Sequence, residues 1–144
     1  MKYTITMSES TELRTDCLVV GLFSGNKLTR SATAIDRATG GLLKRLIQQG
    51  DLEGSLGQTL LVPGGNTLPA LRFLVVGLGR ADQLNRTGFS TIVKSAAKFL
   101  QNTGTKNAVV TLAEVKVGKL DLSERIRMII EGFSDTDYRF DQLI

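Results

Sequence analysis

The residues best placed for chemistry are two glycines and an arginine that follow a short apolar run. Residues 73–76 are all apolar, and Gly77, Gly79 and Arg80 come directly after them. Ligands of α/β folds bind at the carboxyl ends of strands, so this turn is a candidate site for an anion. The dinucleotide fingerprint needs a third glycine where Asp82 stands. A tight turn that packs a helix on its strand needs the same two glycines, and we favour this structural interpretation.

Other catalytic residue types are scarce in this chain. It contains no histidine, and Cys17 is its single cysteine. A Ser-His-Asp or Cys-His arrangement is therefore impossible, and no cysteine pair can hold zinc. Cys17 belongs to an apolar run, which indicates a small buried hydrophobic residue rather than a nucleophile. We predict no catalytic residue and no metal ligand here.

Lysines form the candidate nucleic-acid-binding residues. Lys94 and Lys98 lie one turn apart on a predicted helix, and Lys106 follows that helix. The net charge of +4 permits an acidic partner such as DNA, but it is small beside the basic footprint of nucleic-acid binders. Scattered solubilising lysines are the simpler alternative. A second basic group comprises Lys116, Lys119, Arg125 and Arg127.

Length and composition indicate one globular domain. The chain has 144 residues, of which 42% are hydrophobic and 22% charged. Its apolar runs are too short to cross a membrane, and no secretion signal opens the sequence. With a single cysteine, these features favour a cytoplasmic location and no membrane partner.

Hydrophobic periodicity predicts about six strands interleaved with about four helices. The predicted strands are residues 2–7, 17–23, 58–62, 73–76, 107–112 and 138–142. The predicted helices are residues 31–39 and 41–49, one from about 87 to 101, and one that begins at 121. Residues 24–26 are a predicted turn. This order defines an α/β fold, a three-layer α/β/α domain with a mixed, mostly parallel sheet.

The last predicted helix has a clear beginning. Asp121 followed by Glu124 resembles a capping box. The apolar residues after it recur at helical spacing, so one face should be buried. That face comprises Leu122, Ile126, Ile129, Ile130 and Phe133.

Several stretches together resemble the amino-terminal domain of the leucyl (cytosol) aminopeptidase family. They are residues 17–23, 49–54, 57–61, 72–79 and 138–143. The loop 50–57 leading into Gln-Thr-Leu-Leu is the most distinctive of them. Their order agrees over the whole chain, so the resemblance implies a single non-catalytic domain, residues 1–144, with a macro-domain-like fold.

The resemblance also implies a larger parent protein. Family members carry a carboxy-terminal metallopeptidase domain with two divalent metal ions, manganese or zinc, and release amino-terminal residues from peptides by two-metal hydrolysis. Its signature, Asn-Thr-Asp-Ala-Glu-Gly-Arg, is absent from this sequence. We therefore expect this chain alone to be inactive. Its end, directly after the last predicted strand, suggests a cut.

Partners follow from the same resemblance. The implied ones are the chain's own carboxy-terminal catalytic domain, a homo-hexamer when full length and, in some bacterial members, DNA. The isolated chain is expected to be a monomer. The alternatives are a DNA-binding module and a small-molecule-binding macro-like domain, although the macro-domain glycine loops that grip ADP-ribose are missing here.

Overall fold

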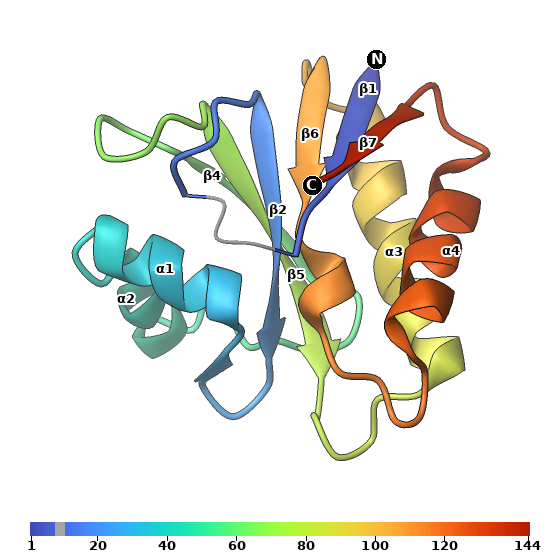
Figure 1. Ribbon diagram of the computed structural model, residues 1–144. Helices are drawn as coiled ribbons and strands as arrows, with labels where there is room; N and C mark the ends of the chain where they lie inside the picture. Colours follow the sequence, from blue (N-terminus) through green and yellow to red (C-terminus); the bar gives the residue numbers. More distant parts are fainter. Residues whose placement is uncertain (8–10) are drawn as a thin grey trace.

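The computed structural model describes residues 1–7 and 11–144 and shows one sheet between two helical layers (Figure 1). The predicted loop over residues 8–15 lies partly outside the described residues. The strands are β1 (Lys2–Ile5), β2 (Cys17–Phe23), β3 (Lys27–Leu28), β4 (Thr59–Pro63), β5 (Arg72–Gly79), β6 (Asn107–Val110) and β7 (Arg139–Leu143). The helices are α1 (Arg30–Ala38), α2 (Leu42–Gln48), α3 (Arg86–Gln101), α4 (Leu122–Phe133) and the short 3-10 helix η1 (Leu112–Glu114).

The sheet is mixed and mostly parallel, as predicted. Its order is β4-β5-β2-β6-β1-β7, and β3 pairs with β2 outside this path. Only β4 and β3 run antiparallel to their neighbours. The described residues thus form seven strands rather than about six. β3 is the extra one, because Gly25 and Asn26 adopt φ values of 80° and 64° and turn the chain back onto β2.

Two hydrophobic cores lie on opposite faces of the sheet. α1 and α2 cover one face, and α3 and α4 cover the other (Figure 1). Leu18 and Phe73 belong to the first core, whereas Val19 and Leu74 belong to the second. Alternate residues of β2 and β5 therefore point into different cores, which explains why residues 17–20 and 73–76 are apolar without interruption.

Gly77 corrects the prediction of a tight turn. β5 continues through Gly77, whose N–H donates to Gln58 at 2.7 Å and whose carbonyl accepts from Gly57 at 2.9 Å. A Cβ on Gly77 would lie 1.9 Å from the Ser55 carbonyl oxygen. The close approach of the loop around Ser55 to the β5 backbone, not a turn, requires glycine at this position. Gly79, with a φ of 73°, does have a turn conformation.

α4 begins as predicted, but its buried face is narrower. The Asp121 carboxylate accepts from the Glu124 N–H at 2.8 Å. Ile129 and Phe133 are fully buried, whereas Leu122 and Ile130 are 39% and 37% exposed, so the prediction is wrong at these two. The reason is that α4 lies beside α3 at the margin of the domain, where only part of its apolar face is covered (Figure 1).

Candidate functional site

The predicted anion turn has an internal partner for its arginine. Gly79 and Arg80 line a hollow of about 320 Å³ next to the start of α3. The Arg80 guanidinium forms two bonds to the Asp82 carboxylate, at 3.0 and 3.2 Å. Asp82 is the residue that replaces the third glycine of a dinucleotide fingerprint. It competes with any external anion for Arg80, and the ligand role of this turn stays a prediction.

The predicted nucleic-acid-binding lysines are all exposed. Lys94 and Lys98 lie on the outer side of α3, and Lys106 directly precedes β6. The three ion pairs found among the described residues do not involve them. They are accessible to a polyanion, and their role also stays a prediction.

A second hollow lies at the carboxyl ends of the parallel strands β1, β2 and β5, whose arrows point to the bottom of Figure 1. We call this hollow of about 470 Å³ the strand-end pocket. Residues that follow β1, β2 and β5 contribute to it, as do the start of α1 and the segment after η1. Its lining comprises Met7, Phe23, Lys27, Thr29, Arg30, Ala81, Glu114, Val115 and Lys116. The strand-end rule for α/β folds makes this position a candidate site.

Glu114 ties two sides of the strand-end pocket together. One of its carboxylate oxygens accepts from the Ser31 N–H at 2.9 Å, and the other accepts from the Ser31 hydroxyl at 2.5 Å. Ser31 lies in the first turn of α1, where unpaired N–H groups and the helix dipole favour a negative charge. The protein thus supplies its own anion at this helix end.

Thr29 completes the beginning of α1. Its hydroxyl oxygen accepts from the Ala32 N–H at 3.2 Å and its hydroxyl donates to the Gly21 carbonyl at 2.7 Å. The cap therefore fixes α1 to β2 as well as starting the helix. With Glu114 on Ser31 and Thr29 on Ala32, the N–H groups of both residues have partners. Side chains, rather than these backbone groups, remain to hold a ligand.

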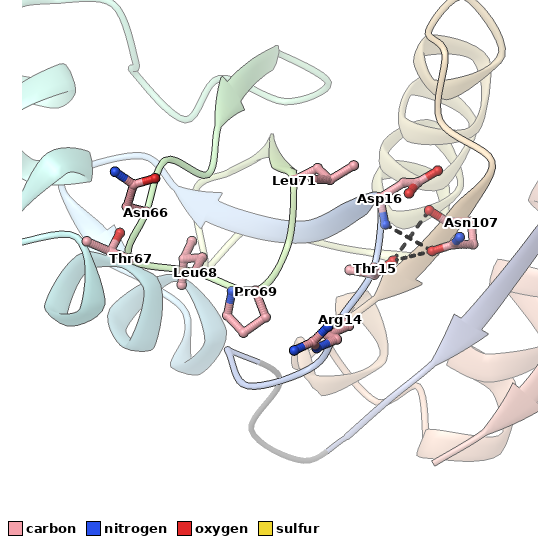
Figure 2. A pocket seen from close by; sticks show the side chains of 9 residues that line it. All are labelled: Arg14, Thr15, Asp16, Asn66, Thr67, Leu68, Pro69, Leu71 and Asn107. Atoms are coloured by element: carbon pink, nitrogen blue, oxygen red, sulfur yellow. Dashed lines mark hydrogen bonds between the residues drawn. The ribbon is translucent and has the colours of Figure 1, made fainter.

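A third hollow lies at the opposite ends of the same strands. We call this space of about 600 Å³ the amino-end hollow. Figure 2 shows Asn107 joined to Thr15 and Asp16 on one side of it, where the Asn107 side-chain oxygen, Oδ1, accepts from the Thr15 hydroxyl and from the Asp16 N–H, both at 2.9 Å. Asp16 in turn accepts from the Lys106 N–H at 2.8 Å. These bonds hold the strand starts together.

Metal ligands and nucleophiles do not assemble in the described part of the chain. No group of three His, Cys, Asp or Glu side chains there could hold a metal ion. Cys17 is fully buried, as predicted, and burial raises the pKa of its thiol to about 12. A thiol with this pKa is protonated at neutral pH and is a poor nucleophile.

The strand-end pocket was largely missed by sequence reasoning. Of its charged residues, only Lys116 was named among the basic residues. Glu114 and Ser31 are 83 positions apart, so no local pattern joins them. Thr29 alone could have indicated this site, because threonine directly before a helix favours the N-cap position.

The fold defines the class of protein, a macro-domain-like α/β/α domain. The macrodomain of Mycobacterium tuberculosis DarG has the same fold, with a TM-score of 0.71, 13% identity and 96% of each chain covered. Residues 19–143 match the N-terminal domain of the cytosol aminopeptidase family. The chain belongs to this family.

Individual relatives agree with this assignment. The chain is 36% identical over 127 residues to a cytosol aminopeptidase of Haemophilus influenzae, covering 88% of this chain and 26% of the relative. A tomato leucine aminopeptidase variant has the same fold, with a TM-score of 0.63 and 17% identity. The match covers 99% of this chain and 32% of the tomato chain. The chain thus spans about a quarter of the length of the Haemophilus relative.

Proposed function

We propose that this chain, residues 1–144, is the single non-catalytic amino-terminal domain of a leucyl aminopeptidase. The full-length enzyme would release amino-terminal residues from peptides in the cytoplasm, and its chemistry would reside in a carboxy-terminal domain. The observation that carries the proposal is the family match over residues 19–143. The share of 26% in the Haemophilus relative leaves ample length for a catalytic domain there.

The two divalent metal ions of the parent reaction belong to that other domain. Manganese or zinc would polarise the peptide carbonyl and activate a water molecule. The residues described here do not fit such a pair, since none of them form a cluster of three suitable ligands. We therefore assign no step of hydrolysis to this chain.

The edge strand β7 is the proposed contact with the catalytic domain. All five of its residues are exposed, and one backbone edge has no neighbouring strand among the described residues. Phe140 and Leu143 are 41% and 53% exposed, although the Phe140 ring lies 5.7 Å from that of Tyr3. An uncovered apolar edge favours pairing with further protein, so we propose that the rest of the parent polypeptide covers it.

An activity assay tests the proposal directly. The purified chain, incubated with a leucyl dipeptide and Mn²⁺ or Zn²⁺, should release no leucine. Robust release that a chelator abolishes would overturn the assignment as a non-catalytic domain. Sedimentation of the same sample should show a monomer, because the hexamer contacts are proposed to depend on the catalytic domain. A stable hexamer of this chain would contradict that part.

A further inference from the structure

We propose that the strand-end pocket binds a small molecule in which an oxyanion, carboxylate or phosphate, is attached to an apolar body. Lys27, Arg30 and Lys116 would hold the oxyanion. This inference goes beyond the aminopeptidase assignment and does not depend on it. No peptidase chemistry is involved, only reversible binding.

Three cationic side chains from three different elements line this pocket. Lys27 belongs to β3, Arg30 is the first residue of α1, and Lys116 follows η1. The ion pairs of the described residues are Lys44–Asp36, Arg80–Asp82 and Arg86–Glu124, so none of the three cations is neutralised in this way. Cations that line one concave site produce a positive potential that attracts anions.

Glu114 does not act as their counter-ion. Both of its carboxylate oxygens face Ser31, at 2.9 and 2.5 Å, and neither forms an ion pair among the described residues. The carboxylate instead fills the position at the helix N-terminus that a ligand anion would otherwise take. An external oxyanion must therefore be bound by the lysine and arginine side chains, and its affinity should depend strongly on salt.

The remaining lining favours an apolar body on the ligand. Phe23 and Met7 are half-buried, Val115 is buried, and all three line the pocket. The volume of about 470 Å³ lies within the range of ligand pockets, which is roughly 300–1,000 Å³. A bare oxyanion would leave most of this space unfilled and these apolar groups in contact with water.

Two other hollows, at the predicted turn and at the amino ends of the strands, are weaker candidates on the same criteria. The predicted turn contains Arg80, but Asp82 already neutralises it. The amino-end hollow has one arginine, Arg14. Its polar side chains already have partners, because Asn107 accepts from the Asp16 N–H and Asp16 accepts from the Lys106 N–H. The strand-end pocket is the hollow of the three in which several cations lack an acidic partner among the described residues.

A calorimetric titration tests the proposal with defined probes. Phenyl phosphate and 3-phenylpropionate are titrated into the chain at low salt, with inorganic phosphate as the probe that lacks an apolar body. At least one aromatic probe should bind more tightly than inorganic phosphate. The tighter of the two aromatic probes identifies the source of the oxyanion. Absence of heat with both would overturn the proposal.

Two opposite charge changes sharpen the test. Lys116→Glu should weaken the better probe about tenfold or more, because it reverses one of the three charges. Glu114→Gln should strengthen the same probe, because it removes the one acidic side chain that the described residues contribute to the lining. The matched control, Lys106→Glu, makes the same change at an exposed lysine outside the strand-end pocket and should leave affinity unchanged.

A loss of binding in a variant must be distinguished from a folding defect. Thermal unfolding of each variant establishes whether it is folded before it is titrated. If Lys106→Glu weakened the probe as much as Lys116→Glu, the binding would be non-specific attraction to a positive protein, and the proposal would fall. An unchanged affinity in a folded Lys116→Glu variant would also contradict it.

Discussion

The strand-end pocket and the amino-end hollow lie at opposite ends of the same strands and have comparable volumes, about 470 and 600 Å³. They differ in how their polar groups are satisfied. At the amino end, Asn107 and Asp16 bond to backbone groups of the segments around them. At the carboxyl end, the Glu114 carboxylate has hydrogen-bond partners, whereas Lys27, Arg30 and Lys116 form no ion pair with any residue that the structure describes. Free charge, rather than volume, distinguishes a candidate site from a structural hollow.

Substituting one glycine at each end compares how closely the backbone is packed there. This comparison should give the largest change in stability. Gly77→Ala should destabilise the protein by about 3 kcal/mol, because the new Cβ would lie 1.9 Å from the Ser55 carbonyl oxygen. Gly104→Ala, before β6 at the amino end, meets no heavy atom within 4 Å and should change stability by less than about 0.5 kcal/mol. Urea unfolding of both variants measures the difference, and equal effects would contradict it.

Removing a polar side chain at either end should destabilise the protein by less than Gly77→Ala does, and the loss should differ between the two ends. Glu114→Ala leaves the buried Ser31 N–H and hydroxyl without their charged partner and should destabilise by about 2 kcal/mol. Asn107→Ala removes two neutral hydrogen bonds at the more exposed end and should destabilise by about 1 kcal/mol. Thermal unfolding under identical conditions ranks the two. A larger effect at Asn107 would reverse the comparison.

Alkaline pH should loosen the amino end first. Burial raises the pKa of Cys17 and of Tyr3 to about 12, and it also raises the pKa of Tyr138. All three lie at or near the amino ends of strands. A raised pKa means that the folded state favours the neutral form of the group. For Cys17, the stability that the buried neutral thiol contributes is therefore complete below pH 9 and is lost as the pH rises through 12.

Tyr3 alone should lower the free energy of unfolding by about 1 kcal/mol at pH 11. Urea midpoints measured at pH 8 and pH 11 give the total loss, to which Cys17 and Tyr138 also contribute. Tyr3→Phe should remove about that much of the difference, since phenylalanine does not ionise. A loss of the same size in the variant and in the unmodified protein would show that another group is responsible.

The exposed lysines should give the smallest change in stability. Lys94→Glu combined with Lys98→Glu should alter the free energy of unfolding by less than about 0.5 kcal/mol, because both side chains are exposed on α3. If the DNA hypothesis holds, the same variant should weaken duplex binding and reduce its salt dependence. Fluorescence anisotropy with labelled duplex DNA measures this. Unchanged affinity would remove these two lysines as the contact.

Much of the fold could be predicted from the sequence. The apolar runs of β2 and β5 indicated buried strands, and these strands are buried on both faces. Asp121 indicated the start of α4, where it caps the helix. β3 could not be predicted, because Lys27 and Leu28 carry no strand pattern. Their pairing depends on the positive φ values of the turn before them.

The candidate site was harder to predict, for a different reason. Gly77 attracted attention as part of a ligand turn, yet its need for glycine comes from Ser55, 22 positions earlier. Glu114 and Ser31 form their contact across 83 positions. Such pairs depend on where the loops cross after the sheet has formed. Residue type and local spacing contain no signal for them.

The burial of Cys17 has a practical consequence for kinetic experiments. Its side chain is fully enclosed in β2, between β5 and β6. A thiol reagent can reach it only when the central strands separate, so modification at neutral pH reports large openings rather than local fraying. The chain thus contains a single natural reporter of its least frequent motions. Its labelling rate, followed with and without a pocket ligand, would measure how far binding slows the opening of the sheet.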